Sequence, residues 1–157
     1  MKKIFFIVLI LFWAIPSGFA QLKTHSFEEA EKLSKENPKP IVVFIHTSWC
    51  KYCKMMENST FKNRDVIKLL NDTFYFISLD AESKNDITVN NHTFKFKLTG
   101  QNTGIHELAV ELATINNEVV YPTITILDTD YSILLQTHSF KDPKTILILL
   151  KEHGNTH

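Results

Sequence analysis

Two cysteines separated by three positions constrain the fold of this chain more than any other feature of its sequence. Cys50 and Cys53 are its only cysteines. They follow a continuous apolar and largely β-branched run, Ile41–Ile45, which is typical of a strand buried on both faces of a sheet. A helix-compatible stretch extends to about Leu70, and a second apolar strand is expected over Phe74–Leu79. This order predicts a right-handed βαβ unit with parallel strands, with both cysteines where the first strand gives way to the helix.

The rest of the chain carries further helix and strand signals. Ser26 and Glu29 match a capping box, Asn90-Asn91 can form the tight turn of a hairpin, and Asp142 before Pro143 is typical of a helix start. Helices are expected over residues 26–36, 105–114 and 142–153, strands over 121–127 and 132–136, a hairpin over 86–97, and a bend near residues 59–60 in the helix after the cysteines. The predicted fold class is α/β, a central mixed β-sheet flanked by helices, with an inserted hairpin and helix.

The first twenty residues have the pattern of a secretory signal peptide. Lys2 and Lys3 precede the apolar run Ile4–Ile15, and small residues lead to Ala20. The run is shorter than the roughly 20 residues of a membrane-spanning helix, although an uncleaved anchor is the alternative. We expect cleavage near Ala20, residues 21–157 as one domain, and a periplasmic or secreted product.

The cysteine pair admits three interpretations. A structural disulfide across so short a loop would stabilise the fold by only roughly 2 kcal/mol. A zinc site would need two more ligands, and no second pair with suitable spacing follows. For redox chemistry, the helix N-terminus would stabilise the thiolate of Cys50, the form that attacks a disulfide. Cys53, one turn further into the helix, would lie deeper and resolve the mixed disulfide.

The residues around the pair resemble a known signature. Trp49-Cys50-Lys51-Tyr52-Cys53-Lys54 is similar to the W-C-x-x-C-K motif of the thioredoxin superfamily, and Tyr121-Pro122-Thr123 resembles its cis-proline segment. The resemblance covers about residues 25–153 and implies a thioredoxin fold, with residues 81–117 as an insertion. It implies that Trp49 contacts partners, that Pro122 lies against the disulfide, and that the backbone of Tyr121 pairs with the substrate chain. The insertion could shape a partner groove or form a structural cap, and a cap is the favoured expectation.

The stretch from Cys53 to Phe61 is similar to the C-terminal domain of the transmembrane disulfide reductase DsbD. One position departs from the superfamily pattern, because Phe44 stands where thioredoxins usually carry a buried aspartate that helps proton transfer. Glu57 lies four residues after Cys53 and matches a glutamate of the DsbD domain. Our hypothesis is that Glu57 handles the proton instead, and the alternative is an ordinary solvated glutamate.

The resemblance implies thiol–disulfide exchange, with Cys50, Cys53 and Glu57 as catalytic residues. Reduction of disulfide-containing protein substrates is the expected direction, because Lys51-Tyr52 lacks the histidine that strongly oxidising relatives carry between their cysteines. An exported dithiol would also need a membrane-bound thiol electron donor. No cofactor or metal is implied, and 17 basic against 17 acidic residues give no positive excess for a nucleic-acid partner.

Two alternatives remain open at this stage. A disulfide oxidase or isomerase would use the same cysteines at a higher reduction potential. A copper-binding protein of the thioredoxin fold would use them as ligands, with His46 as a further ligand. His46 could instead tune the thiolate, or it could simply end the strand.

Overall fold

The computed structural model describes residues 21–154, which fold around a four-stranded sheet with the order β10-β9-β1-β2. β1 (Ile41–His46) runs parallel to β2 (Tyr75–Asp80). Its other neighbour, β9 (Thr123–Leu127), is antiparallel, and β10 (Ile133–His138) adds to β9 in the same sense. The predicted mixed sheet and α/β fold class are therefore confirmed.

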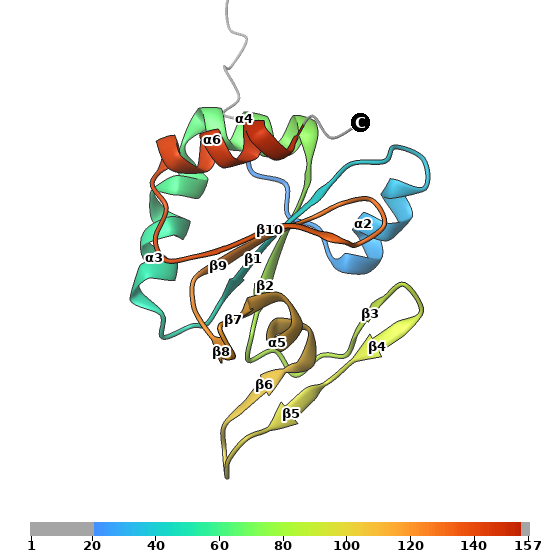
Figure 1. The fold of residues 1–157 in the computed structure, drawn as a ribbon, viewed down its shortest axis with the longest axis vertical. Helices are drawn as coiled ribbons and strands as arrows, with labels where there is room; N and C mark the ends of the chain where they lie inside the picture. Colours follow the sequence, from blue (N-terminus) through green and yellow to red (C-terminus); the bar gives the residue numbers. More distant parts are fainter. Residues whose placement is uncertain (1–20, 155–157) are drawn as a thin grey trace, which may run out of the picture.

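Helices cover both faces of this sheet (Figure 1). One face is covered by α3, α4 and α6, which contribute to a single apolar cluster with β1 and β9. The other face is covered by α2 and α5, in a second cluster. The helical segments are α2 (Phe27–Ser34), α3 (Lys51–Asn58), the short 3-10 turn η1 (Thr60–Lys62), α4 (Arg64–Thr73), α5 (Glu107–Ala113) and α6 (Pro143–His153).

β1 separates the two clusters, because successive side chains of a strand point to opposite faces. Val42 and Phe44 pack with α3, whereas Ile41, Val43 and Ile45 pack with α2 and α5. All five of these side chains are buried. This two-sided burial is why the sequence of β1 shows no polar alternation.

The single bent helix expected after the cysteines is in fact two helices. α3 ends at Asn58, and Ser59 adopts φ −127° and ψ −67°, outside the helical region. The hydroxyl of Ser59 donates to the carbonyl of Met55 and so satisfies a carbonyl at the end of α3. Asn63 then caps α4, accepting from the backbone N–H groups of Asp65 and Val66. The helical pattern of the sequence did not reveal this new start.

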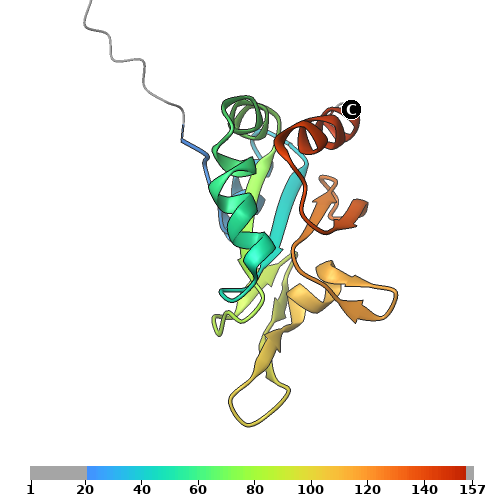
Figure 2. The same ribbon diagram turned by 90° about the vertical axis from the view of Figure 1, so that its left-hand side faces the viewer.

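The insertion between β2 and β9 contains the predicted hairpin and two further ribbons (Figure 2). β3 (Ile87–Val89) and β4 (His92–Phe94) pair across Asn90 and Asn91, whose φ angles of 48° and 62° suit a tight hairpin turn. β5 (Phe96–Leu98) pairs with β6 (Gly104–His106), and β7 (Thr114–Ile115) pairs with β8 (Glu118–Val119). Neither ribbon was predicted from the sequence, and the helix expected from residue 105 begins at Glu107 as α5.

Most of the insertion packs onto the body of the protein. Leu108 and Leu112 of α5 are buried in the cluster shared with β1 and α2. The buried hydroxyl of Thr125 in β9 donates to the carbonyl of Leu112. The β3–β4 hairpin is attached to α2, since the backbone N–H of Thr88 donates to the carboxylate of Glu28. These contacts bury α5 against the sheet and attach the hairpin to α2, and the role of the insertion as a structural cap stays a prediction.

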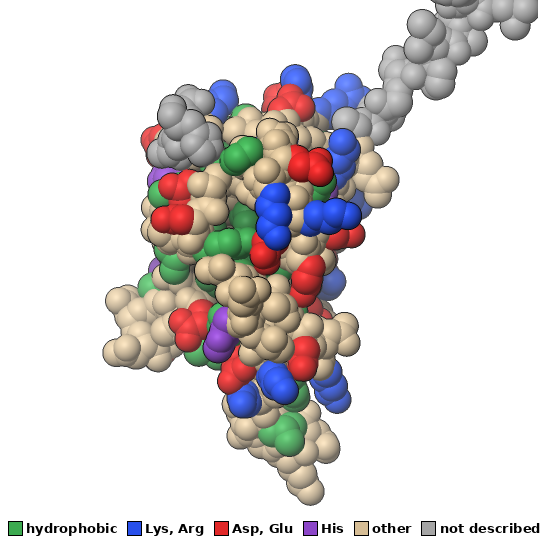
Figure 3. Space-filling model, turned by 90° about the vertical axis from the view of Figure 1, so that its right-hand side faces the viewer, with side chains coloured by type: hydrophobic (Ala, Val, Ile, Leu, Met, Phe, Trp, Pro, Cys, Tyr) green, Lys and Arg blue, Asp and Glu red, His purple; other side chains and the backbone are tan. Residues whose placement is uncertain are grey.

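The remaining surface is mixed in charge where it is visible beside α2 and the hairpin. On this face, Lys and Arg side chains lie interspersed with Asp and Glu, and apolar side chains are visible between them (Figure 3). Within residues 21–154, no helix has the length and apolar character needed to cross a bilayer. The expected signal peptide, residues 1–20, lies outside the described residues.

Candidate active site

Cys50 and Cys53 form a disulfide at the start of α3, with their Cα atoms 5.2 Å apart. Cys50 occupies the N-cap position, and its Sγ accepts a hydrogen bond of 3.2 Å from the backbone N–H of Cys53. Cys53 is fully buried, whereas 6% of Cys50 is exposed. The first cysteine is therefore the one nearer to solvent, and the helix N-terminus beside it favours a negative charge on its sulfur.

Trp49 and Tyr52 lie on either side of Cys50 and are the exposed aromatic residues of the site, with 67% and 58% of their surface accessible. The indole N–H of Trp49 donates to Oε1 of Glu82 over 3.0 Å. Its ring meets Tyr121 edge-on, with 6.1 Å between the ring centroids. Trp49 is therefore held in place although it faces solvent.

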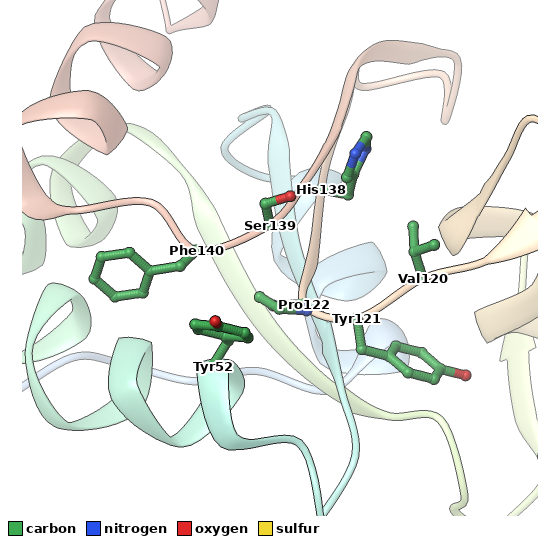
Figure 4. A pocket seen from close by; sticks show the side chains of 7 residues that line it. All are labelled: Tyr52, Val120, Tyr121, Pro122, His138, Ser139 and Phe140. Atoms are coloured by element: carbon green, nitrogen blue, oxygen red, sulfur yellow. The ribbon is translucent and has the colours of Figure 1, made fainter.

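The Tyr121-Pro122 peptide bond is cis, as the resemblance implied. Both residues line a pocket, with Phe140 and Tyr52, which stands between the two cysteines in the sequence, on the other side (Figure 4). The pocket is completed by Val120, His138 and Ser139. Burial, followed by the charges of Glu82 and Asp80, raises the pKa of Tyr121 to about 12, so its phenol stays protonated at neutral pH.

Glu57 extends from the far end of α3 and is bound through one carboxylate oxygen, while the other approaches His46. Oε2 accepts from the ammonium group of Lys54 over 2.9 Å, and Oε1 lies 3.8 Å from Nδ1 of His46. Residues four apart on a helix share one face, with about 5–6 Å between their Cβ atoms, so Glu57 and Cys53 lie on the same face of α3. The side chain of Glu57 is 31% exposed, whereas Cys53 is fully buried.

His46 ends β1 and lies between the sheet and Glu57. Its Nε2 is 2.9 Å from the hydroxyl of Ser78, and its ring stacks on Phe44 with 5.1 Å between the ring centroids. Burial lowers the pKa of His46, although the carboxylates of Glu57 and Asp80 oppose this effect. His46 is therefore neutral at neutral pH.

Phe44 takes the place expected for a buried acid and is itself 1% exposed. Its ring contacts Phe61 edge-on, with 4.8 Å between the centroids. The side chain at this position is apolar, and the titratable pair of this region is His46 at the end of β1 with Glu57 on the Cys53 face of α3. The described residues contain no cluster of three or more His, Cys, Asp or Glu side chains suited to holding a metal ion.

The structure brings together most of the residues that the sequence analysis selected. Trp49 touches Tyr121, and Pro122 shares a pocket with the residue between the cysteines. Two contributors were missed, Glu82 and Ser78. Each belongs to a common polar residue type with no motif, and each reaches the site only because β2 lies next to β1 in the sheet.

A family model described as "Protein of unknown function, DUF255", with the name Thioredox_DsbH, matches residues 19–121 of the chain. An uncharacterized protein of Caenorhabditis elegans is 38% identical over 60 residues. The match spans 38% of this chain but 8% of the worm protein, so the chain corresponds to a small part of that relative.

Solved structures with the same fold include "DsbH Oxidoreductase", at a TM-score of 0.63 and 18% identity over 90% of both chains. A thioredoxin from Thermus thermophilus gives a TM-score of 0.59 at 18% identity, covering 84% of this chain and 86% of that one. The reduced C-terminal domain of DsbD from Neisseria meningitidis gives 0.51 at 16% identity, covering 78% and 89%. These likenesses establish the thioredoxin fold.

Proposed function

The chain belongs to the DsbH (DUF255) family of thioredoxin-like proteins, and on this premise we propose that it reduces protein disulfides outside the cytoplasm through Cys50 and Cys53. A thioredoxin fold with a C-x-x-C pair at the start of a helix supports thiol–disulfide oxidoreductase activity. The direction of the reaction, its location and its partners are the further parts of the proposal.

The observation that carries the proposal is the difference between the two sulfurs. Cys50 is at the N-cap of α3 and keeps 6% of its surface accessible, whereas Cys53 is fully buried one turn later. A thiolate at a helix N-terminus, on the more accessible of the two sulfur-bearing residues, suits attack on a partner, and a fully buried neighbouring thiol suits the closing step. A purely structural disulfide would not require this difference.

The reaction transfers two electrons from the dithiol of this protein to the disulfide of the substrate. The thiolate of Cys50 attacks a substrate disulfide, forming a mixed disulfide and releasing one substrate sulfur as a thiolate, which takes a proton from solvent. Glu57 accepts the proton of the Cys53 thiol, and the resulting thiolate attacks Sγ of Cys50. The Cys50–Cys53 bond forms, the bond to the substrate breaks, and two electrons have passed from the protein to the substrate.

The substrate-binding surface in this proposal is the aromatic group around the disulfide, formed by Trp49, Tyr52 and Tyr121. The backbone beside cis-Pro122 lies at the same pocket and would pair with the extended substrate chain. Lys51-Tyr52 provides no histidine between the cysteines to stabilise the thiolate further, which favours reduction over oxidation. A membrane-bound thiol donor would return the protein to its dithiol form.

The deciding experiment is the reduction potential of the protein, measured by equilibration with glutathione buffers. We expect a value near or below roughly −200 mV, toward that of thioredoxin. A value near roughly −120 mV, as in DsbA, would show that the protein makes disulfides and would contradict the proposed direction. Stoichiometric copper(I) binding without insulin reduction would instead support a copper-binding protein.

A further inference from the structure

We propose that His46 is a positioning residue for the reaction, which holds the Glu57 carboxyl beside Cys53 and gives it a hydrogen-bond partner both before and after it takes the thiol proton. This inference rests on the proposed function. It adds a residue that the cysteine motif does not contain and that acts through Glu57 rather than on the substrate.

The geometry points to His46 because of an incompletely satisfied nitrogen. Within the described residues, the buried Nδ1 of His46 has no hydrogen-bond partner. Oε1 of Glu57 lies 3.8 Å away, beyond hydrogen-bond distance but close enough for a small side-chain movement to form the bond. A buried polar atom without a partner is costly, so this pair has a reason to close when the site is working.

The groups around His46 restrict what it can do. Glu57 and Lys54 face it from α3, and Asp80 is its partner in the register of β2. Burial is the largest influence on the pKa of His46 and lowers it, so the ring is neutral when the thiols exchange at neutral pH. A neutral imidazole offers one N–H donor and one acceptor nitrogen, and the partner of each nitrogen decides which carries the proton.

Ser78 allows His46 to exchange these two roles. The hydroxyl at Nε2 can either donate or accept, because Ser78 Oγ has a rotatable hydrogen and free lone pairs. When Glu57 is a carboxylate, Ser78 donates to Nε2 and the N–H at Nδ1 points to Glu57. When Glu57 is protonated, its O–H donates to Nδ1, and the N–H at Nε2 donates to Ser78. Both protonation states of Glu57 therefore find a partner without a charge on the ring.

This arrangement supports the resolving step. The Cys53 thiol gives its proton to the Glu57 carboxylate, and Cys53 is then a thiolate that displaces the substrate sulfur from Cys50. The second oxygen of Glu57 stays paired with Lys54, which holds the carboxyl group on this side of α3. Glu57 is partly exposed and returns the proton to solvent afterwards.

The test is the pH dependence of the resolving step in the full chain. The reduced protein is mixed with saturating oxidised glutathione, and the release of the second glutathione is followed from acidic to neutral pH. In His46→Phe, which keeps an aromatic ring against Phe44, the carboxylate loses its N–H partner. We expect the acid limb of the profile to move to higher pH by about one unit, which is about tenfold in rate on that limb.

Matched variants separate this role from a structural one. In the Glu57→Gln background, His46→Phe should produce no further shift, because His46 acts through Glu57. His92→Phe changes a histidine of the distant β3–β4 hairpin and should keep the wild-type profile. Ser78→Ala removes only the partner of Nε2 and should shift the acid limb in the same direction by less.

Two outcomes would overturn the inference: a His46→Phe profile that superimposes on that of the wild type, or an equal shift in the Glu57→Gln background. If His46→Phe does not fold, Ser78→Ala decides, and an unchanged acid limb in that variant contradicts the proposal. Absence of any exchange by the wild-type protein would be a different result, because it would reject the proposed function itself.

Discussion

At the scale of single residues, the burial of His46 at the end of β1 makes the free energy of unfolding depend on pH. The pKa of His46 is lowered by burial in the folded protein, from an ordinary value near 6.5. Unfolding restores the ordinary value, so the unfolded chain binds more protons than the folded one between the two pKa values. Below about pH 6.5, protonation of the unfolded chain at this position favours unfolding.

We therefore predict that His46 makes the free energy of unfolding rise with pH over the window that ends near 6.5, and contributes no pH dependence above it. In His46→Phe the rise should be shallower, because the group that titrates differently in the two states is gone. Urea unfolding of the oxidised wild type and variant at several pH values measures the two slopes. Parallel curves for the two proteins would show that His46 titrates alike in the folded and unfolded states.

At the scale of secondary structure, the sequence predicted those elements whose signal is local. β1 is read from its unbroken apolar run, and α2 from a capping box that the structure contains in full. The β5–β6 and β7–β8 ribbons were missed because strands of two or three residues are too short to show a periodic pattern. The break after α3 depends on the non-helical backbone of Ser59. The helical pattern of the sequence runs on through this position and does not mark the break.

Two leucines of the insertion test its structural role. Leu112 of α5 is 6% exposed and lies in the core cluster beneath the sheet, whereas Leu98 at the end of β5 is 72% exposed. Leu112→Ala should lower the free energy of unfolding by about 2–5 kcal/mol, since it leaves a cavity in a packed core. Chemical denaturation at fixed pH measures this loss.

The matched control is Leu98→Ala, which should change the free energy of unfolding by less than about 0.5 kcal/mol because it removes exposed surface only. If both substitutions cost little, α5 does not act as a cap, and the insertion would be an appendage. If Leu98→Ala selectively slowed the reduction of a protein substrate, the β5–β6 ribbon would have a role in substrate binding.

At the scale of the whole molecule, the candidate site lies where segments distant in the sequence meet. Cys50, Cys53 and Trp49 were predictable because they lie in one short motif, and Pro122 because the resemblance placed it. The contributions of Glu82 and Ser78 depend on how β2 lies beside β1, which no local pattern contains. His46 and Glu57 likewise come close only because α3 packs against the sheet near the end of β1, and no local sequence pattern contains this packing.

The redox pair also couples to the stability of the entire fold through a thermodynamic cycle. Reduction and unfolding can occur in either order, so the two routes from the folded disulfide form to the unfolded dithiol form have the same total free energy. The oxidised and reduced proteins therefore differ in unfolding free energy by the same amount by which the folded and unfolded chains differ in reduction free energy. For this two-electron couple, about 30 mV corresponds to about 1.4 kcal/mol. In DsbA, a strong oxidant, the reduced form is the more stable one.

In a protein that acts as a reductant, the oxidised form should be the more stable of the two. Comparing the two stabilities therefore tests the direction of electron flow without a substrate. We predict that the oxidised protein unfolds at a higher urea concentration than the dithiol form, because a folded state that favours the disulfide lowers the reduction potential relative to the unfolded chain. Parallel urea titrations with and without excess dithiothreitol measure both midpoints. The Cys50→Ser/Cys53→Ser double variant serves as the control, and its midpoint should not respond to the reductant. A reduced form more stable than the oxidised form would mean that folding drives the cysteines toward the dithiol, as in an oxidase, and the proposed direction of electron flow would have to be reversed.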